Sequence, residues 1–427
     1  MSRVAFATLG CKVNQDESLG LQALFARAGF TAVPFGEEAD IYVVNTCTVT
    51  HLGSRKSRQL LRQAKRANPE SLVVAVGCYP QTAPEELQAI DEVDLIVGNS
   101  HKHQLVELVE QALKDKERRV LVEEPGEFRD LPLAPTGRRR STLKIQEGCR
   151  RFCTYCIVPY ARGGLRSMPP AQVVEKALAL EAMGYREIVL TGINLTSYGQ
   201  EGTEYSLVDV IHGLKVLSQA RLRISSVEPN DFSPALLEAI KANPLMCRHF
   251  HIPLQSGSDK ILTAMGRKYT RQEYLNLINT LKASFYLPSF STDIIVGFPG
   301  EEDSDFRQLL DLVRNVGFSR LHVFRYSPRQ GTPAAGYSRQ VPEPVKGERS
   351  RLLTALGQTA ALEYGAKLIG ERENLLVEEE SELIPRGSVG YGERYLRIHT
   401  PEFLPPGSTH QVEVTGQRGS DLVGRLV

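Results

Sequence analysis

Short apolar runs that are typical of strands alternate with helical patterns along most of the chain, and this alternation limits the possible folds more than any other feature. In the first 125 residues the strand-like runs are VAFATLGC, IYVVNTC, LVVAVGC and DLIVGNS, and the helical patterns are LGLQALFARAG and SRKSRQLLRQAKRA. Strands that alternate with helices in this way form parallel sheets with helices packed on their faces. We therefore predict an α/β domain with a parallel sheet at residues 1–125.

The alternation resumes after a stretch rich in proline, glycine and charge, which we interpret as a linker at residues 126–140. From residue 141 six strand candidates follow, with amphipathic helices between them: STLKIQEGC, EIVLTG, RLRISSVEP, HFHIPLQSG, STDIIVGFPGE and RLHVFRYSP. Six β/α units predict an open or partial (β/α)6 barrel at residues 141–365 rather than a closed barrel of eight. Polar and glycine residues recur where these strands end, which is where α/β barrels carry their chemistry.

The last segment, residues 366–427, has a different character. Its strand-like runs NLLVEEE, YLRIHT, THQVEVTGQ and LVGRLV are short and are separated by glycine and proline turns. This pattern is typical of a small β-barrel. The whole sequence therefore predicts the α/β class, with a parallel-sheet domain, a partial barrel and a C-terminal β-barrel.

Composition limits the classes of partner. The net charge is +1 at pH 7, so a polyanion would have to be held by local basic patches. The first residues lack the pattern of a signal peptide, and no apolar run approaches the ~20 residues of a membrane span. We therefore expect a cytoplasmic protein without a membrane partner, whose seven cysteines stay reduced and need an explanation other than disulfides. For the isolated Cys247 we favour the role of a small buried apolar side chain.

Three cysteines, which we name the loop cysteines, are crowded into the motif C-x3-C-x2-C: Cys149, Cys153 and Cys156. On a loop after a strand, three thiolates at this spacing can converge on one iron–sulfur cluster, and a 4Fe-4S cluster needs four ligands. With three, one iron keeps an open position for a substrate or cofactor. A zinc knuckle is the alternative, together with coincident thiols, but zinc would need a fourth ligand at close spacing and the next histidine is His212.

Three further cysteines, which we name the strand-end cysteines, each follow an apolar strand: Cys11, Cys47 and Cys78. In a parallel sheet the carboxyl ends of the strands lie at one edge, where open α/β folds bind ligands. Cysteines far apart in sequence can therefore meet in space. Three buried structural thiols are the alternative, but the recurrence at three strand ends favours a second three-cysteine cluster.

The loop cysteines resemble the signature of the radical S-adenosylmethionine (SAM) superfamily. The resemblance implies a 4Fe-4S cluster on Cys149, Cys153 and Cys156 whose open iron binds SAM, and whose reduced form releases a 5′-deoxyadenosyl radical. It also implies that Tyr155 meets the adenine of SAM. By the same resemblance, further SAM contacts lie at the strand ends, with turn formation or helix capping as the alternative role for each: Thr191, Gly192, Asn194, Ser226, Glu228, Gln255, Ser256, Ile295 and Gly297.

With the strand-end cysteines added, essentially the whole chain resembles the methylthiotransferase family, which joins a three-cysteine domain, a radical SAM domain and a C-terminal TRAM β-barrel. The motifs LGCKVNQ, NTCTVT, GCRRFCTYCIVPYARG and HIPLQSGSDKIL are most similar to the MtaB-type branch of that family. The resemblance implies two 4Fe-4S clusters, SAM and an electron donor such as a flavodoxin or ferredoxin. The implied reaction replaces the C2 hydrogen of N6-threonylcarbamoyladenosine, next to the anticodon of tRNA, with a methylthio group.

Other targets stay open at this point. The same chemistry on N6-isopentenyladenosine in tRNA, or on an aspartate of a ribosomal protein, is the first alternative, and a non-enzymatic metal-containing RNA-binding protein is a remote one. If both cysteine sets serve one base, the N-terminal domain must cover the mouth of the barrel. A structure with Cys47 and Cys153 on opposite sides of the chain would exclude this arrangement.

Local basic groups are candidates for RNA phosphate contacts, although a solvated helix face is the usual role of such charge runs. One group falls on a single stripe at helical spacing after Cys47, a second lies beside the loop cysteines, and a third lies in the terminal β-barrel. The members are Arg55, Arg58, Arg62 and Arg66; Arg150 and Arg151, with Arg162 and Arg166; and Arg394 and Arg397.

Overall fold

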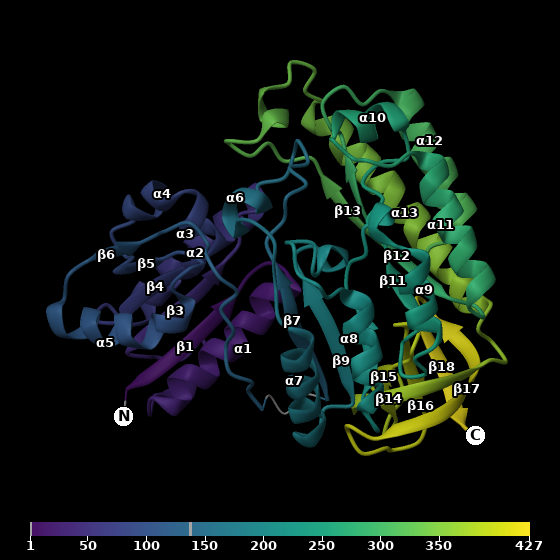
Figure 1. Cartoon of the computed structure of the whole chain (residues 1–427), viewed down its shortest axis with the longest axis horizontal. Helices are drawn as coiled ribbons and strands as arrows, with labels where there is room; N and C mark the ends of the chain where they lie inside the picture. Colours follow the sequence, from purple (N-terminus) through teal and green to yellow (C-terminus); the bar gives the residue numbers. More distant parts are fainter. Residues whose placement is uncertain (1, 136–138) are drawn as a thin grey trace.

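The computed structural model of the chain describes residues 2–135 and 139–427. It has three parts: an α/β part that contains the N-terminus, an open barrel in the middle and a small β-barrel at the C-terminal end (Figure 1). Residues 136–138 of the predicted linker lie outside the described residues. Among the described helices, none combines the length and the apolar character needed to cross a bilayer.

The N-terminal sheet has six parallel strands in the order β2-β1-β3-β4-β5-β6. Helices α1 and α5 pack on one face, and α2, α3 and α4 pack on the other. The strands are β1 (Arg3–Thr8), β2 (Thr31–Val33), β3 (Ile41–Thr46), β4 (Leu72–Gly77), β5 (Leu95–Val97) and β6 (Arg119–Leu121). The helices are α1 (Lys12–Arg27), α2 (His51–Ala67), α3 (Cys78–Thr82), α4 (Pro84–Gln88) and α5 (Leu105–Asp115).

Burial explains which of these strands the sequence revealed. Every residue of β3 and β4 is buried, because helices cover both faces of the sheet, and such strands read as continuous apolar runs. The four predicted strands of this part are confirmed. The edge strands β2 and β6 have three residues each and are largely exposed or half-buried, so they left no apolar run in the sequence.

The middle part contains the six predicted strands, all of which are confirmed, and it forms an open barrel. Parallel pairing joins β7 to β9 and β9 to β10 in one group, and β11 to β12 and β12 to β13 in another. Isolated bridges such as that between Ser226 and His251 connect the groups. The strands are β7 (Arg140–Glu147), β8 (Arg166–Ser167, antiparallel to β7), β9 (Glu187–Gly192), β10 (Arg221–Ile224), β11 (His249–His251), β12 (Ser289–Val296) and β13 (Arg320–Arg325).

Helices pack outside these strands and enclose one apolar core with them. They are α7 (Pro170–Ala182), α8 (Leu207–Gly213), α9 (Pro234–Lys241), α10 (Asp259–Ala264), α11 (Arg271–Ser284), α12 (Asp303–Val316) and α13 (Glu343–Ala366). Helix α6 (Val158–Arg162) instead contacts α3 of the N-terminal part. Short 3-10 helices lie in connections of the chain: η1 (Lys102–Gln104), η2 (Leu195–Ser197), η3 (Leu214–Val216), η4 (Pro229–Asp231) and η5 (Pro333–Gly336).

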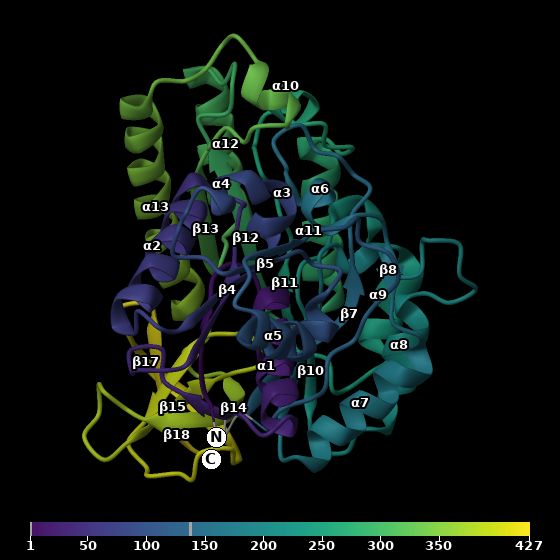
Figure 2. The ribbon, with the colours of Figure 1, turned by 90° about the vertical axis from the view of Figure 1, so that its left-hand side faces the viewer.

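The N-terminal part covers the open side of the barrel. Helix α1 packs against β7 and β9, and the elements of the N-terminal sheet lie in front of the barrel strands in Figure 2. Hydrogen bonds cross this contact: Arg329 donates to Thr48 Oγ1 at 2.7 Å and to Ser54 Oγ at 2.8 Å, and Asn99 Nδ2 donates to the Ala161 carbonyl at 2.7 Å. The α/β class with a partial barrel is confirmed.

The C-terminal strands form a closed five-stranded barrel in the order β14-β15-β16-β18-β17, which confirms the predicted small β-barrel. It docks at the amino ends of the open barrel's strands: Arg221 on β10 donates to the carbonyls of Asn374 and Tyr391 at 2.7 and 2.8 Å, and Ser289 on β12 donates to the Arg394 carbonyl at 2.6 Å. The strands are β14 (Arg372–Glu380), β15 (Ser388–Tyr391), β16 (Arg397–Thr400), β17 (Thr409–Arg418) and β18 (Asp421–Leu426).

Candidate functional site

The strand-end cysteines lie at one edge of the N-terminal sheet. Cys11, Cys47 and Cys78 come directly after β1, β3 and β4 or close behind them, and these three strands are adjacent and parallel. Gly10 has a φ of +100°, and a Cβ at this position would lie 3.0 Å from the Cβ of Cys47. Glycine therefore lets the loop that carries Cys11 approach Cys47 closely. The strand order is what brings the three thiols to one place.

The loop cysteines follow β7 on a tightly folded loop. Cys156 N–H donates to the Cys153 carbonyl at 2.9 Å, and Cys149 N–H donates to the Gly163 carbonyl at 3.0 Å. Gly148, at the start of the loop, has a φ of +78°, and a Cβ there would lie only 1.7 Å from the carbonyl oxygen of Gly164. No other residue fits this turn without moving the backbone, so the glycine fixes the direction in which the loop leaves β7.

The cysteines of both sets include buried thiols, which become thiolates at neutral pH only when a metal centre binds them. Burial raises the pKa of Cys47 to about 11 and that of Cys156 to about 12, and the neighbouring cysteines of each set add to the rise. Within the described residues, no three cysteine sulfurs lie within 4.8 Å of one another. A single zinc ion, with Zn–S bonds of about 2.3 Å, would hold them that close. The donor sets therefore fit two multi-iron clusters better than two zinc ions.

Arg162 connects the two parts of the molecule beneath the strand-end cysteines. It belongs to α6 of the open barrel, its side chain is 1% exposed, and its Nε donates to Cys78 Sγ at 3.3 Å. Its remaining donors reach Asn14 at 2.5 Å, Glu17 at 2.5 and 3.0 Å, and Glu147 at 2.7 Å. The sequence placed Arg162 among residues available to RNA, and this is wrong, because the guanidinium is buried and fully used inside the protein.

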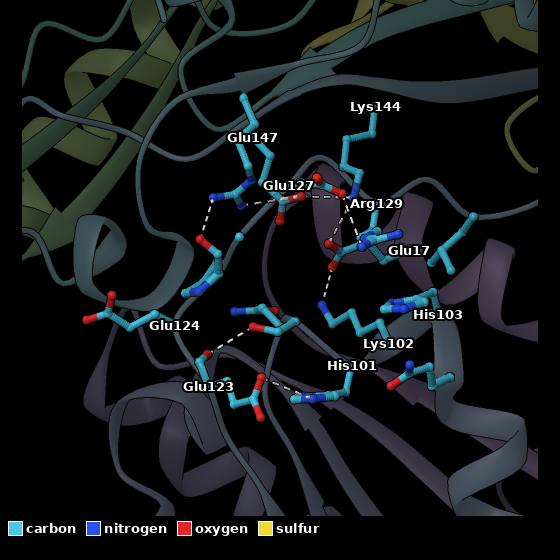
Figure 3. Close-up of a pocket in the computed structure, with 17 residues that line it drawn as sticks. Glu17, His101, Lys102, His103, Glu123, Glu124, Glu127, Arg129, Lys144 and Glu147 are labelled. Carbon is cyan, nitrogen blue, oxygen red and sulfur yellow. Dashed lines mark hydrogen bonds and ion pairs between the residues drawn. The ribbon is translucent and has the colours of Figure 1, made fainter.

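Arg162 is part of a buried charge network at the contact between the N-terminal sheet and the open barrel. Figure 3 shows Glu17 between Lys102 and Lys144 beside a cavity of about 280 Å³, with both lysines paired to it. Burial alone would raise the pKa of Glu17, but Arg162 and the two lysines hold it well below its usual range. The network therefore stays ionised, and it attaches α1, whose N-terminus carries Cys11, to β7.

A second arginine supports the loop cysteines. Arg267 donates to Cys153 Sγ at 3.5 Å and to Glu228 at 2.5 Å, and it lies over the ring of Tyr269 at 5.0 Å from the centroid. Glu228, predicted from the resemblance as a SAM contact, is thereby held close to the loop cysteines. Sequence reasoning missed Arg267 because it lies more than 100 positions after Cys153, although the segment MGRKYT that contains it was a signal that could have found it.

A cavity of about 190 Å³, which we name the mouth cavity, lies between the loop cysteines and the segment that follows Cys47. Val49 and Thr50, just after Cys47, form one side of it, and Tyr155 and Cys156 form another. Three of the predicted SAM contacts line it: Tyr155, Gln255 and Ile295. Cys47 and Cys153 therefore do not lie on opposite sides of the chain, and the N-terminal part covers the barrel mouth.

The other predicted SAM contacts do not line the mouth cavity. Asn194 N–H donates to Gln146 Oε1 at 2.8 Å, and Gly297 N–H donates to Glu301 Oε1 at 2.9 Å, so both hold neighbouring loops in place. The remaining members lie at strand ends, buried or half-buried, and their contact with SAM stays a prediction: Thr191, Gly192, Ser226 and Ser256.

The predicted RNA-binding arginines separate into exposed and occupied groups. Three are exposed and have no ion pair in the described structure: Arg55, Arg66 and Arg150. Three others have a carboxylate partner: Arg62 lies 3.9 Å from Glu92, Arg58 pairs with Glu86 at 3.5 Å, and Arg151 pairs with Asp231 at 2.5 Å. Of these, Arg62 is exposed. Arg394 is a correction, because it is 3% exposed and paired to the buried Glu373. Arg397 pairs with Glu379 and Glu382, so its charge is neutralised and it is not a free phosphate contact.

Polar groups inside the barrel were also missed. His251 on β11, Asp293 on β12 and His322 on β13 bring one nitrogen or oxygen each within 4.8 Å of one another, and Lys12 of α1 reaches the same interior. A signal for Asp293 was present, since it interrupts the apolar strand STDIIV. Cys247 is buried, as predicted for a small apolar side chain.

Comparison with known proteins agrees with this geometry. The Radical SAM superfamily matches residues 143–313, which contain the loop cysteines, and the Uncharacterized protein family UPF0004 matches residues 3–98, which contain the strand-end cysteines. The radical S-adenosylmethionine methyltransferase TsrM from Kitasatospora setae has a similar fold, with a TM-score of 0.57 at 16% identity over 78% of this chain and 77% of that one.

Relatives of known name match nearly the whole chain. Threonylcarbamoyladenosine tRNA methylthiotransferase MtaB is 40% identical in Bacillus subtilis over 93% of this chain and 90% of the relative, and 40% identical in Aquifex aeolicus over 90% and 94%. The tRNA-2-methylthio-N(6)-dimethylallyladenosine synthase of Pelotomaculum thermopropionicum is 38% identical over 100% and 98%. With relatives of this identity covering nearly its whole length, the chain belongs to the methylthiotransferase family of radical SAM enzymes.

Proposed function

We infer that this chain is a tRNA methylthiotransferase that replaces the C2 hydrogen of N6-threonylcarbamoyladenosine, next to the anticodon, with a methylthio group. The observation that carries the inference is the mouth cavity, which is lined by Cys156 and by the residues just after Cys47, in a chain 40% identical to MtaB enzymes over most of its length. An aromatic C–H bond is not acidic enough for a side-chain base to remove its proton at neutral pH. A radical route is therefore required. One cysteine set would hold the cluster that starts the radical reaction, and the other set would hold the second cluster.

The residues present fit two iron–sulfur clusters and SAM. Cys149, Cys153 and Cys156 would hold one cluster, and the strand-end cysteines would hold the other, each set leaving one iron without a protein ligand. When bound, these groups supply the radical and the methylthio group. Tyr155, Gln255 and Ile295 shape the cavity in which SAM and the target base would meet.

The chain's own residues orient these groups and limit the access of water. Arg267 fixes Glu228 and Cys153 relative to each other, and Arg162 ties Cys78 to the barrel. Both arginines also donate an N–H to a cysteine sulfur, which is one of the ways in which a protein sets the reduction potential of a cluster. The apolar side chains of Val49, Ile295 and Phe324 form part of the cavity wall.

The RNA, the electron donor and the compartment complete the proposal. Exposed arginines of α2 and the cysteine loop, Arg55, Arg66 and Arg150, would contact tRNA phosphates near the cavity. A flavodoxin or ferredoxin would supply electrons in the cytoplasm. The parts with separate roles would be residues 1–125, a linker at 126–140, the radical SAM domain at 141–365 and the TRAM-like barrel at 366–427.

Mass spectrometry of nucleosides tests the proposal. We would digest tRNA from cells that lack a methylthiotransferase and express this chain, or its Cys149→Ala or Cys47→Ala variant. The expected result is 2-methylthio-N6-threonylcarbamoyladenosine with the wild-type chain only. Methylthiolation of N6-isopentenyladenosine instead would keep the chemistry and change the substrate. No methylthio nucleoside, together with a modified aspartate in a ribosomal protein, would reject a tRNA target.

A further inference from the structure

Lys12 is a charged residue of the site that forms no ion pair with any described residue. It follows Cys11 directly, it is the first residue of α1, and it is half-buried. Its Nζ lies 6.0 Å from the ring centroid of Tyr395, and no hydrogen bond or ion pair to it is formed by any described residue. It lines a cavity of about 390 Å³, which we name the basal cavity, together with Arg140 and Arg223.

The carboxylates around Lys12 are already in use. Glu187 accepts hydrogen bonds from Arg223 at 2.9 Å and from Arg221 at 2.7 Å, so both of its carboxylate oxygens are occupied. Glu378 pairs with Arg140 at 3.4 Å. Glu379 pairs with Arg397 at 3.1 Å. Asp293 lies 3.3 Å from His251, which is an ion-pair partner only when its ring is protonated.

The cations Lys12, Arg140 and Arg223 line the basal cavity, and of these three Lys12 alone has no ion pair with a described residue. Arg320 and Lys12 act on His322 as cations, and Asp293 is the carboxylate that opposes them. The two cations disfavour a further cation at the His251–Asp293–His322 group, and the ammonium group of Lys12 can accept an anion as its partner. A partly buried ammonium group without a counter-ion is unfavourable, and an anionic ligand would compensate it with charge-assisted hydrogen bonds.

Position connects Lys12 with the reaction. Asp293 lines the mouth cavity, and it also lies within electrostatic reach of Lys12. A base in the mouth cavity could therefore extend a substituent into the barrel toward the ammonium group. In adenine, C2 and C6 are separated only by N1, so a ligand held through its N6 substituent has its C2 position fixed as well.

We propose that Lys12 binds the carboxylate of the threonylcarbamoyl group on N6 of the target adenosine, and so selects this nucleoside over one with an uncharged N6 substituent. The proposal rests on the proposed function and adds the residue that reads the substrate. Lys12 adjoins the cluster ligand Cys11 in sequence. Binding the carboxylate therefore orients the base relative to the strand-end cysteines.

The test compares two RNAs with the cluster-loaded enzyme. Both are tRNA anticodon stem-loops, one with N6-threonylcarbamoyladenosine and the other with its methyl ester, which has the same shape but no negative charge. Charge-assisted hydrogen bonds predict that the wild-type enzyme favours the acid by roughly 10-fold or more in kcat/KM and in binding affinity. For Lys12→Gln the acid-to-ester ratio should fall to about 1, chiefly through weaker use of the acid, and Lys12→Arg should keep part of the preference.

Lys56→Gln is the matched control, because Lys56 is an exposed lysine of the neighbouring helix α2. It should change the affinity for both RNAs equally and leave their ratio at the wild-type value. Iron content and RNA-independent SAM cleavage show whether each variant keeps its clusters, and RNA binding by fluorescence anisotropy gives a ratio that does not depend on turnover. The proposal is overturned if Lys12→Gln keeps the wild-type ratio, or if the wild-type enzyme does not distinguish acid from ester. Failure of the proposed function looks different, since the wild-type enzyme would then methylthiolate neither RNA.

Discussion

Replacing Arg162 with methionine tests whether one buried guanidinium holds the two parts of the site together. Methionine fills much of the same space but removes the donors to Cys78, Glu17 and Glu147. Removal of one partner from a buried ion pair typically costs about 3–5 kcal/mol, because the remaining charge is left uncompensated. Lys102 and Lys144 stay beside Glu17, so we expect the lower end of this range, about 3 kcal/mol.

Hydrogen exchange of backbone amides measures this loss where it occurs. Because ~1.4 kcal/mol corresponds to a factor of ten, amides of α1 and α6 should exchange roughly 100-fold faster in Arg162→Met. Iron content should fall from about eight to about four atoms per chain, since the strand-end cysteines lose their support while the loop cysteines keep theirs. Arg150→Met is the control, because Arg150 is an exposed arginine of the loop that precedes α6 and has no ion pair among the described residues.

One result would refute the reasoning. If Arg162→Met exchanged its α1 and α6 amides as slowly as Arg150→Met and kept all of its iron, the buried contacts of Arg162 would not be what joins the two parts. Faster exchange over the whole chain, including the C-terminal barrel, would also contradict a local role.

Three further predictions follow from the geometry. Gly10→Ala should lose the iron of the strand-end cysteines and keep that of the loop cysteines, because a Cβ would crowd Cys47 and a φ of +100° is strained for alanine; full iron content would contradict this. Burial alone would raise the pKa of Glu187, but the arginines of β10 hold it well below its usual value, so its stabilising effect is complete above pH ~4.3 and is lost as the pH falls below that value. The free energy of unfolding from urea titration should therefore change less between pH 6 and pH 3.5 for Glu187→Gln than for the wild type. An equal change in both proteins would contradict the stabilising role of the carboxylate. Arg394→Ala should cost about 3–5 kcal/mol and make the C-terminal barrel sensitive to protease, whereas the exposed Arg425→Ala should change its stability by no more than about 0.5 kcal/mol; similar cleavage of both variants would contradict the buried role.

Much of the architecture could be predicted from the sequence, because strands that are buried on both faces of a parallel sheet consist of continuous apolar runs. The predicted barrel strands are present, and β3 and β4 are buried throughout their length. The short edge strands β2 and β6 were not predicted, because strands of three partly exposed residues have no periodic pattern of apolar residues.

Charged residues were the main source of error. Arg150 and Arg162 are twelve positions apart in one motif, yet the first is exposed and the second is almost completely buried. Arg394 belongs to a turn of the terminal barrel, but its guanidinium lies against buried Glu373. Sequence gives the charge of such residues, whereas their partners come from distant segments and are known only after the chain is folded.

The sequence alone determined the chemistry that the chain can carry: six cysteines at strand ends and on one loop, within alternating strands and helices. Only the tertiary structure decided how these groups face each other, because strand order and the docking of α1 on β7 are long-range contacts. The mouth cavity, the buried Arg162 network and Lys12, which has no ion pair with a described residue, all lie at the contact between two parts of the chain. Local sequence patterns do not predict that contact, because its stability depends on which charges and surfaces meet when the two parts pack together.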